Sequence, residues 1–397
     1  MLKGLGEIQI ELRGLELEGW LISDYRGRNP VARRALALGD RERSRRLFYW
    51  IPADGLPVLL AHRAEARGLP ELPGDVLRYS SWAELRDGLS STLPNRGLVA
   101  MEHCPMGSNP ELSHVDAGTL ELILSYGPQV VSSADLVQRF LCAFDEAQRE
   151  SHGRAADALA RLKDEVLGWI AVEREAARPV TEGGVRAHLL ESLEREGLRA
   201  GDPPRVAFGS HTADPCHAPV EEKDRALCDG DLIRLELAGR ETGAEGAFAF
   251  LAWIAYAGER VPPRLAQEFG HVAHARDEAL DLLRRRLESG RRVLGFEVDR
   301  VARDALARAG LRERCPHRMG HHLGIESAHG LGASLDDLET HDTRPLLTGM
   351  AFAVRPGVYF EDHGLRTGMS VYLADSGPKP TTPLQEEIHP IGAKATD

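Results

Sequence analysis

The stretch HRMGHHLGIESAHG, residues 317–330, holds four histidines and one glutamate. Such density is typical of a metal site, because imidazole nitrogens and carboxylate oxygens are donors that zinc prefers. His317 and His321 lie four apart and would share one face of a helix, but the interspersed glycines disfavour a regular helix. The H-E-x-x-H pattern is absent, because an arginine follows the first histidine. Two interpretations remain: metal ligands, or a histidine-rich loop beside a pocket, with neutral imidazoles as hydrogen-bond partners or bases.

Two further segments carry groups suited to acid–base or anion chemistry. FGSHTADPCHAP contains His211 and His217 in a Gly-, Asp- and Pro-rich loop after a strand-like run. Functional residues are often found in such loops, although a surface turn with incidental histidines is the simpler alternative. VRPGVYFEDHGLRTG contains Arg355 and Arg366, whose guanidinium groups could hold a carboxylate through paired N–H donors.

A fourth cluster, ETHDTRP, places two acidic residues, a histidine and an arginine within seven positions, at residues 339–345. A charged loop of this kind more often forms a solvated face or a local network of salt bridges than a catalytic site. We therefore predict a structural role for it.

Composition limits the classes of function. The chain has 397 residues, 42% of them hydrophobic, and a net charge of −12, which argues against nucleic acid as a partner. No apolar run reaches the roughly 18–20 residues that a membrane helix needs, so no membrane association is expected. The N-terminus lacks the apolar segment of a signal peptide. The five cysteines are widely spaced, which disfavours a disulfide framework, and a cytoplasmic location is the simplest expectation.

The first part of the chain reads as a mixed α/β unit. Short runs of aromatic and β-branched residues, bounded by Gly and Pro, predict strands, and one amphipathic run predicts a helix. The strands are expected at 16–25, 46–52, 55–62 and 97–103, and the helix at 81–93. Because the composition changes after residue 142, we expect a domain boundary there.

The remainder predicts two rounds of a helix pair followed by strands. Apolar residues at three-to-four spacing indicate helices, expected at 147–176, 185–197, 264–290 and 296–310. Strands are expected at 205–210, 231–239, 246–258, 349–360 and 369–375. This order favours helices that cover a curved antiparallel sheet.

Taken in order, these motifs resemble the pita-bread family, which contains methionine aminopeptidase, prolidase, Xaa-Pro aminopeptidase and the metal-free creatinase. MGHHLG is similar to the family's G-H-x-x-G, GMAFAVRPGVY to G-M-x-x-x-x-E-P-G-x-Y, and GLRTG to G-x-R-x-E. The resemblance implies an α+β fold, with a creatinase-type α/β domain over residues 1–142 and a pita-bread domain with pseudo-twofold helix–sheet halves over 143–397. It also implies a homodimer.

The peptidase members of that family hold two divalent metals through two Asp, one His and two Glu. By the resemblance, the matching residues in this chain are Leu237, Phe248, His321, Arg355 and Gly368. Only the histidine can ligate, and the arginine would place a fixed positive charge where a dication belongs, which costs several kcal/mol at about 4 Å. The resemblance therefore implies a site without metal or cofactor.

Two glutamates near the first of these positions could restore a ligand. Glu236 is adjacent to Leu237 and is expected to point to the opposite face of its strand, while Glu245 lies in the following turn. Either would serve only if the strand register slipped, and a slip of one residue reverses every side chain.

Three functions remain open. The first is a metal-independent enzyme acting on a small amino-acid-like or carboxylated metabolite, by creatinase-like C–N hydrolysis or a related elimination or cyclisation. Its candidate catalytic residues are His217, His321, Glu326 and His329, and its candidate substrate-binding residues are His322, Arg355, Arg366, His211 and Phe248. The second is a non-catalytic binding protein that keeps the fold. The third is a metal-dependent Xaa-Pro peptidase.

Overall fold

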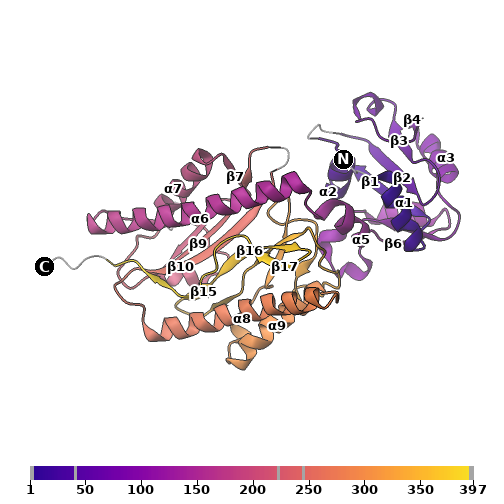
Figure 1. The fold of residues 1–397 in the computed structure, drawn as a ribbon. Coiled ribbons are helices and arrows are strands. Elements are labelled where there is room, and N and C mark those ends of the chain that lie inside the picture. The colour runs from indigo at the N-terminus through magenta and orange to yellow at the C-terminus, as the bar shows by residue number, and fades with distance from the viewer. Residues whose placement is uncertain (1–3, 40–42, 221–223, 244–245, 393–397) are drawn as a thin grey trace. The chain divides into compact units, whose positions relative to one another are not determined.

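The computed structural model describes residues 4–39, 43–220, 224–243 and 246–392 (Figure 1). Glu245, one of the two alternative metal ligands, lies outside the described residues. The chain separates into two compact units, Met1–Cys142 and Ala143–Asp397. No described helix combines the length and the apolar character that crossing a membrane requires.

The first unit is built on a six-stranded sheet with the order β4-β3-β2-β1-β5-β6. Its central strands β1 and β2 pair antiparallel, whereas β5 runs parallel to β1. The strands are β1 (Gly19–Tyr25), β2 (Arg46–Pro52), β3 (Val58–His62), β4 (Asp75–Tyr79), β5 (Leu98–Met101) and β6 (Gln129–Ser132). A core that includes Leu21, Phe48 and Leu60 packs on this sheet.

The helices of the first unit are short. They are α1 (Leu5–Gly14), α2 (Pro30–Ala35), α3 (Trp82–Thr92), α4 (Ala117–Leu124) and α5 (Ala134–Val137), with 3-10 turns η1 (Ala66–Gly68), η2 (Pro105–Gly107) and η3 (Pro110–Leu112) and a π-helical turn η4 (Gln138–Cys142). The start of α3 is fixed by a capping box, in which Ser81 and Glu84 each bond the other's backbone N–H.

The second unit is built on a ten-stranded mixed sheet whose main path is β12-β11-β13-β16-β10-β9-β7. The remaining members pair at its sides: β17 with β16, β18 with β10 and β8 with β9. The strands are β7 (Leu198–Ala200), β8 (Arg205–Phe208), β9 (Leu232–Glu241), β10 (Ala249–Tyr256), β11 (Gly320–Leu323), β12 (Ser334–Leu335), β13 (Ala351–Val354), β16 (Gly368–Ala374), β17 (Gly377–Pro380) and β18 (His389–Pro390). A separate hairpin joins β14 (Gly357–Tyr359) to β15 (Gly364–Arg366).

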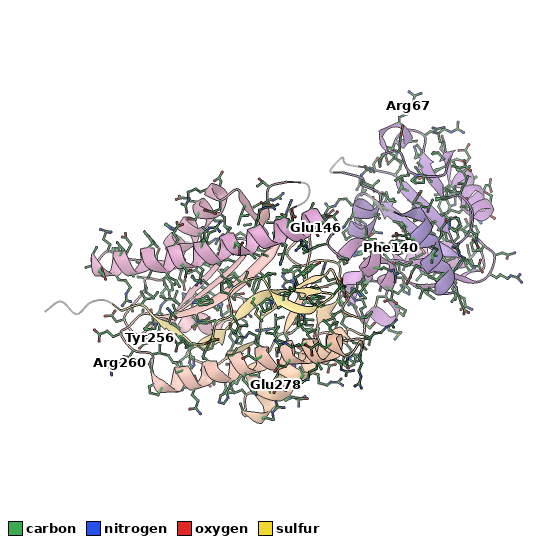
Figure 2. The ribbon with its side chains drawn as sticks, viewed as in Figure 1. Arg67, Phe140, Glu146, Tyr256, Arg260 and Glu278 are labelled. Carbon is green, nitrogen blue, oxygen red and sulfur yellow. The ribbon has the colours of Figure 1, made fainter. Side chains whose placement is uncertain are left out.

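Two helix pairs accompany this sheet, and in Figure 1 they lie along two sides of it. The pairs are α6 (Glu146–Glu175) with α7 (Glu182–Arg195), and α8 (Pro263–Glu288) with α9 (Gly295–Arg308); the 3-10 turns are η5 (Gly209–Ala213) and η7 (Arg312–Arg314). The long helix α6 packs on β9 and β10. Side chains fill the space between helices and strands, with Glu146 at the start of α6 and Tyr256 at the end of β10 (Figure 2).

The core between α6 and the sheet sets the faces of the strands. Leu235 and Leu237 of β9 are buried with Leu159 and Leu162 of α6 in one cluster of hydrophobic side chains. Since side chains alternate along a strand, residues 234, 236 and 238 face the opposite side of the sheet. That opposite face carries the candidate site.

Candidate active site

A narrow pocket opens on the face of the sheet opposite α6. It draws residues from β8, β9, β10 and β11, from the loop before β8, and from the segments that follow β11 and β13. Its lining consists of Asp202, Pro203, Arg205, Glu236, Leu237, Ala238, Phe250, His321, Ala328, His329 and Arg355. Three of the residues singled out in the sequence, His321, His329 and Arg355, are therefore brought together.

Glu236 faces this pocket, contrary to the prediction that it points away. The strand register pairs Glu236 with Ala252 and Leu237 with Leu251, and Leu237 belongs to the core against α6. The match to the family motif had placed Leu237 at the site, but the residue of β9 whose side chain faces the pocket is its neighbour, Glu236. Glu236 is thus the carboxylate that β9 presents at the site.

Two arginines neutralise that carboxylate. Arg366 donates from Nη1 to both oxygens of Glu236, at 2.8 and 2.7 Å, and Arg234 Nε lies 3.2 Å from Oε1. Burial would raise the pKa of Glu236, but the charges of Arg366, Arg234 and Arg355 outweigh it and lower the pKa to about 2. The group is therefore ionised at every physiological pH.

Arg355 differs from the other two arginines because its guanidinium has no acceptor. No described residue accepts a hydrogen bond from this side chain, whereas Arg366 and Arg234 both pair with Glu236; the buried Nε lacks a hydrogen-bond partner in all three arginines. Its Cζ lies 5.9 Å from the centre of the Phe250 ring. Burial and the nearby Arg366 charge lower its pKa to about 10, so the group stays protonated at neutral pH. A charged donor that lines a pocket without a partner is suited to binding an anion.

Two imidazoles stand beside that arginine. The rings of His321 and His329 stack with centroids 3.9 Å apart and an interplanar angle of 20°. His321 is buried, whereas His329 is classed as exposed, and both line the pocket. Burial, together with the charge of Arg355, lowers the pKa of His329 to about 4 and holds that of His321 well below its usual value. Both rings are neutral at pH 7.

The contacts of His321 fix which nitrogen is free. Its Nδ1 lies 3.1 Å from the carbonyl oxygen of His322, and only a protonated Nδ1 can donate to that oxygen. The lone pair therefore resides on Nε2. This nitrogen is available to accept a proton or a hydrogen bond from a molecule in the pocket.

His317 and Tyr359 line the inner side of the arginine cluster. His317 Nε2 lies 3.0 Å from the Tyr359 hydroxyl, and its Nδ1 lies 2.8 Å from the Arg318 carbonyl oxygen. Tyr359 also lies under Arg366, with 5.5 Å between Cζ and the ring centre. Burial raises the pKa of Tyr359 to about 12. This pair is a neutral, hydrogen-bonded support for the charged groups.

The residues at the site do not fit two divalent metals. Of the five positions where the family's peptidases carry ligands, only His321 offers a donor atom, and the adjacent carboxylate of Glu236 is already bound by Arg366. At Gly368, an added Cβ would lie 2.7 Å from Cε1 of Phe250 and 3.1 Å from Cβ of Arg355. The Phe250 ring thus occupies the space that a ligating side chain at position 368 would need. Three guanidinium groups around one carboxylate leave a net positive charge, which repels cations.

Several predicted residues lie away from the pocket. Phe248 belongs to a hydrophobic cluster with Phe144 and Leu323 and does not line the pocket; Phe250, two residues further along β10, takes that place. His322 points to the other side of β11, where its Nδ1 accepts from Gly332 N at 3.1 Å. Glu326 is exposed.

Arg366 does not line the pocket, and its Nη1 is bonded to Glu236. His211 and His217 lie in a neighbouring cluster: His211 Nδ1 and His217 Nε2 each lie 3.0 Å from Oε2 of Glu182. Neither histidine lines the pocket. No local sequence pattern links Glu182 to these histidines, because it lies 29 and 35 residues before them.

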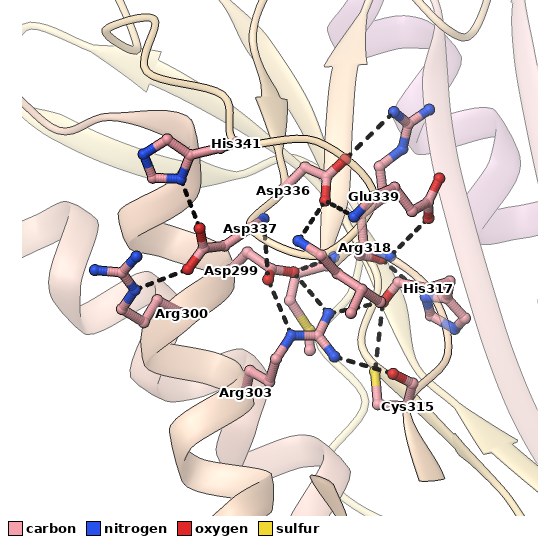
Figure 3. Close-up of polar contacts among 12 residues, drawn as sticks. Asp299, Arg300, Arg303, Cys315, His317, Arg318, Asp336, Asp337, Glu339 and His341 are labelled. Atoms are coloured by element: carbon pink, nitrogen blue, oxygen red, sulfur yellow. Dashed lines mark hydrogen bonds and ion pairs between the residues drawn. The ribbon is translucent and has the colours of Figure 1, made fainter. Parts of the chain in front are cut away.

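The charged loop at 339–345 forms local salt bridges, one of the two arrangements expected for it. Asp342 and Arg344 form a buried ion pair, and Asp342 also accepts from the backbone of Ser334 in β12. Figure 3 shows the neighbouring network, in which Asp299 binds Arg303 and accepts from the backbone of Met319. These contacts hold the segment that leads into β11, and so fix the position of His321.

The sequence pattern around Arg234 and Glu236 indicates that both residues belong to the site. In LIRLEL, two charged residues alternate with leucines, and this period places both charges on one face of a strand. A buried strand with charges on one face indicates an ion-pair site on that face. Phe250 and Arg205 gave no such signal, because their roles depend on where the pocket lies.

Comparison with known proteins gives one family and a consistent fold. The model of metallopeptidase family M24 matches residues 146–375. A probable dipeptidase PepE of Mycobacterium tuberculosis is 28% identical over 335 residues, covering 82% of this chain and 80% of that protein.

Solved structures agree with this match. The dipeptidase PepE of Mycobacterium ulcerans has a TM-score of 0.76 at 22% identity and covers 98% of this chain and 97% of its own. An X-Pro aminopeptidase of Thermotoga maritima has a TM-score of 0.67 at 20% identity, covering 98% and 100%. The predicted α+β fold of pita-bread type is therefore confirmed.

Proposed function

We propose that this chain, which belongs to metallopeptidase family M24, is a metal-independent enzyme that acts on a C–N bond of a small carboxylated, amino-acid-like substrate. One observation carries the proposal: Arg355, at a position where the family's peptidases place a metal ligand, lines the pocket with an unpaired guanidinium. A carboxylate that entered the pocket would supply the missing acceptor.

Arg355 would supply the positive charge that the metal ions supply in the family's peptidases. A protonated guanidinium can bind a substrate carboxylate through two N–H groups, or stabilise an oxyanion as negative charge develops. Arg366 and Arg234 each pair with Glu236, whereas Arg355 lines the pocket and has no acceptor among the described residues. The negative charge of Glu236 offsets the repulsion between the three guanidinium groups and so helps to hold Arg355 in place.

His321 supplies the base. Its Nε2 lone pair can take a proton from a water molecule as that water adds to the carbon of the C–N bond. The imidazolium then returns the proton to the nitrogen, which leaves as the C–N bond breaks, so that the reaction consumes one water. His329, stacked on His321, orients the base and shields it at the pocket mouth.

A second function is favoured by the same imidazoles. The low pKa values of His321 and His329 make both rings weak bases, and a weak base lowers the rate of proton abstraction. A pocket of this kind could bind a carboxylate without transforming it. The chain would then be a binding protein that keeps the peptidase fold.

Turnover assays separate these functions. The protein is dialysed against EDTA and incubated with N-acyl amino acids, N-carbamoyl amino acids, guanidino acids and dipeptides, with release of the amine as the readout. The proposal predicts that one class is cleaved without added metal and that His321→Ala abolishes the cleavage. Cleavage of Xaa-Pro dipeptides only after addition of Mn²⁺ or Co²⁺ would contradict it. Carboxylate binding that depends on Arg355, with no turnover in any class, would favour the binding function.

A further inference from the structure

A second cluster of donor groups lies outside the pocket. Glu182, His211 and His217 each offer one ligand atom, and these three atoms lie within 4.8 Å of one another. His211 Nδ1 is 3.0 Å from both oxygens of Glu182, and His217 Nε2 is 3.0 Å from Oε2. The two imidazole rings are 4.4 Å apart between centroids. Two nitrogens and a carboxylate therefore converge on one point.

The three residues come from two elements that the fold holds side by side. Glu182 is the first residue of α7, which Thr181 caps through its side chain. His211 lies in η5, directly after β8, and His217 lies in the loop that follows. A backbone bond from Phe208 N to Glu182 Oε1, at 2.6 Å, joins the end of β8 to the start of the helix. The carboxylate is therefore fixed before any ligand binds.

The buried carboxylate of Glu182 would be stabilised by a cation. Its side chain is fully buried, and a buried carboxylate is costly unless a positive charge compensates it. Among the described residues, no lysine or arginine pairs with Glu182; its partners are the two histidines and the Phe208 backbone. The positive end of α7 contributes only part of a charge. A bound cation would complete the compensation.

The donor set is one that zinc uses. Two histidines and one glutamate form the protein ligands of several catalytic zinc sites, with a fourth position left to water. At zinc–ligand distances of about 2.0–2.2 Å, neighbouring ligand atoms in a tetrahedron lie roughly 3.3 Å apart. The observed 3.0 Å separations need to widen by only a few tenths of an ångström. The His211 side chain is 31% exposed, which gives solvent access to the open position.

We propose that Glu182, His211 and His217 bind one zinc ion, at a site separate from the Arg355 pocket. The ion would tie the loop that carries both histidines to the start of α7. This loop also accepts hydrogen bonds from the arginine cluster: Thr212 O and Asp214 O from Arg234, and Pro215 O from Arg366. Zinc would thus stabilise the shell behind the pocket. It would take no part in the C–N chemistry, and the site does not depend on the proposed function.

Zinc titration tests the site directly. The full-length protein is stripped with EDTA, dialysed and titrated with ZnCl2 by calorimetry. One equivalent should bind, and His211→Ala, His217→Ala and Glu182→Gln should each weaken binding by more than about 100-fold, since losing an outer partner alone costs 10–100-fold. His274→Ala, which removes an exposed histidine of α8, and His321→Ala, which removes the pocket imidazole, should leave binding unchanged.

Cobalt gives a readout of geometry. CoCl2 added to the stripped protein should produce visible absorption bands of a low-symmetry four- or five-coordinate site, and ZnCl2 should displace them. The His211→Ala variant, at a half-buried position, should remain folded by circular dichroism yet lose these bands, which separates loss of a ligand from loss of the fold. The proposal is overturned if the stripped wild-type protein binds no zinc at micromolar concentration. It is equally overturned if His321→Ala abolishes binding while His211→Ala and Glu182→Gln retain it.

Discussion

Arg366 donates from Nη1 to both carboxylate oxygens of Glu236, at 2.8 and 2.7 Å, in the middle of a buried cluster of charges. Arg234 lies on the other side of the same carboxylate. Glu236 is therefore a structural anion that keeps three guanidinium groups close together, and Arg355 is the one among them that finds no acceptor in the part of the chain that the structure describes.

Replacing Glu236 by glutamine should destabilise the protein strongly. Removing one partner of a buried ion pair leaves the other charges uncompensated and costs about 3–5 kcal/mol in the free energy of unfolding. Urea denaturation measures this cost. Glu241→Gln is the matched control, because its pair with Arg154 is exposed and should contribute at most about 1 kcal/mol. Equal, small effects of both substitutions would show that the cluster is not held by Glu236.

The stabilisation by Glu236 should depend on pH in a defined direction. The pKa of its carboxyl is lowered from 4.5 to about 2 in the folded chain, so the unfolded chain binds the proton more readily. The contribution is complete above the unfolded pKa and is lost as the pH falls from about 4.5 towards 2. The difference in unfolding free energy between wild type and Glu236→Gln should therefore be constant from pH 8 to 5 and should narrow below that. A difference that grows on acidification would contradict this assignment.

Phe250 and position 368 should be coupled. A Cβ at Gly368 would lie 2.7 Å from Cε1 of Phe250, so Gly368→Ala should destabilise the protein by about 1–3 kcal/mol through overpacking. In a Phe250→Leu background the cost should shrink, giving a coupling of at least about 0.5 kcal/mol in a double-mutant cycle. Gly270→Ala in α8, where an added Cβ meets nothing within 4 Å, is the control. If the free-energy effects of Gly368→Ala and Phe250→Leu were strictly additive, the Phe250 ring would not fill the space beside position 368.

The two pocket imidazoles should give a flat pH dependence near neutrality. Burial and the Arg355 charge keep His321 and His329 neutral, the latter with a pKa of about 4. Because both folded pKa values lie below that of a free histidine, neither ring gains a proton between pH 8 and 6. Carboxylate affinity, measured by calorimetry, should be unchanged over that range. An apparent pKa near 6.5 that disappears in His321→Ala would show that the ring titrates normally.

The sequence predicts those parts of the fold that depend on contacts between residues close together in the chain. The helix α6 and the strand β2 follow from local periodicity, and their bounds differ little from those expected at 147–176 and 46–52. The loop at 339–345 could also be interpreted from its own charges. Short amphipathic signals fail where a helix has few turns, as for α2.

The site required information that local patterns do not contain. A shift of one residue in β9 decided between Leu237 and Glu236, and only packing against α6 settles it. His217 was predicted to be catalytic because it matches an active-site histidine in the corresponding loop of the pita-bread family, yet its partner Glu182 lies on a helix 35 residues earlier. Such pairings arise from tertiary packing, which no single segment specifies.

The most direct test is carboxylate binding by protein freed of divalent metals. Wild type, Arg355→Ala and Arg291→Ala are dialysed against EDTA and titrated with N-acetylglycine and glycyl-L-proline by calorimetry; Arg291 is exposed and does not line the pocket. The account predicts that at least one of these carboxylates binds wild type and Arg291→Ala equally. It also predicts that Arg355→Ala weakens binding by about 10-fold or more, as expected for loss of a charge-assisted hydrogen bond worth about 1.5–3 kcal/mol. Binding that appears only after a divalent metal is restored, or that Arg355→Ala leaves unchanged, would contradict it.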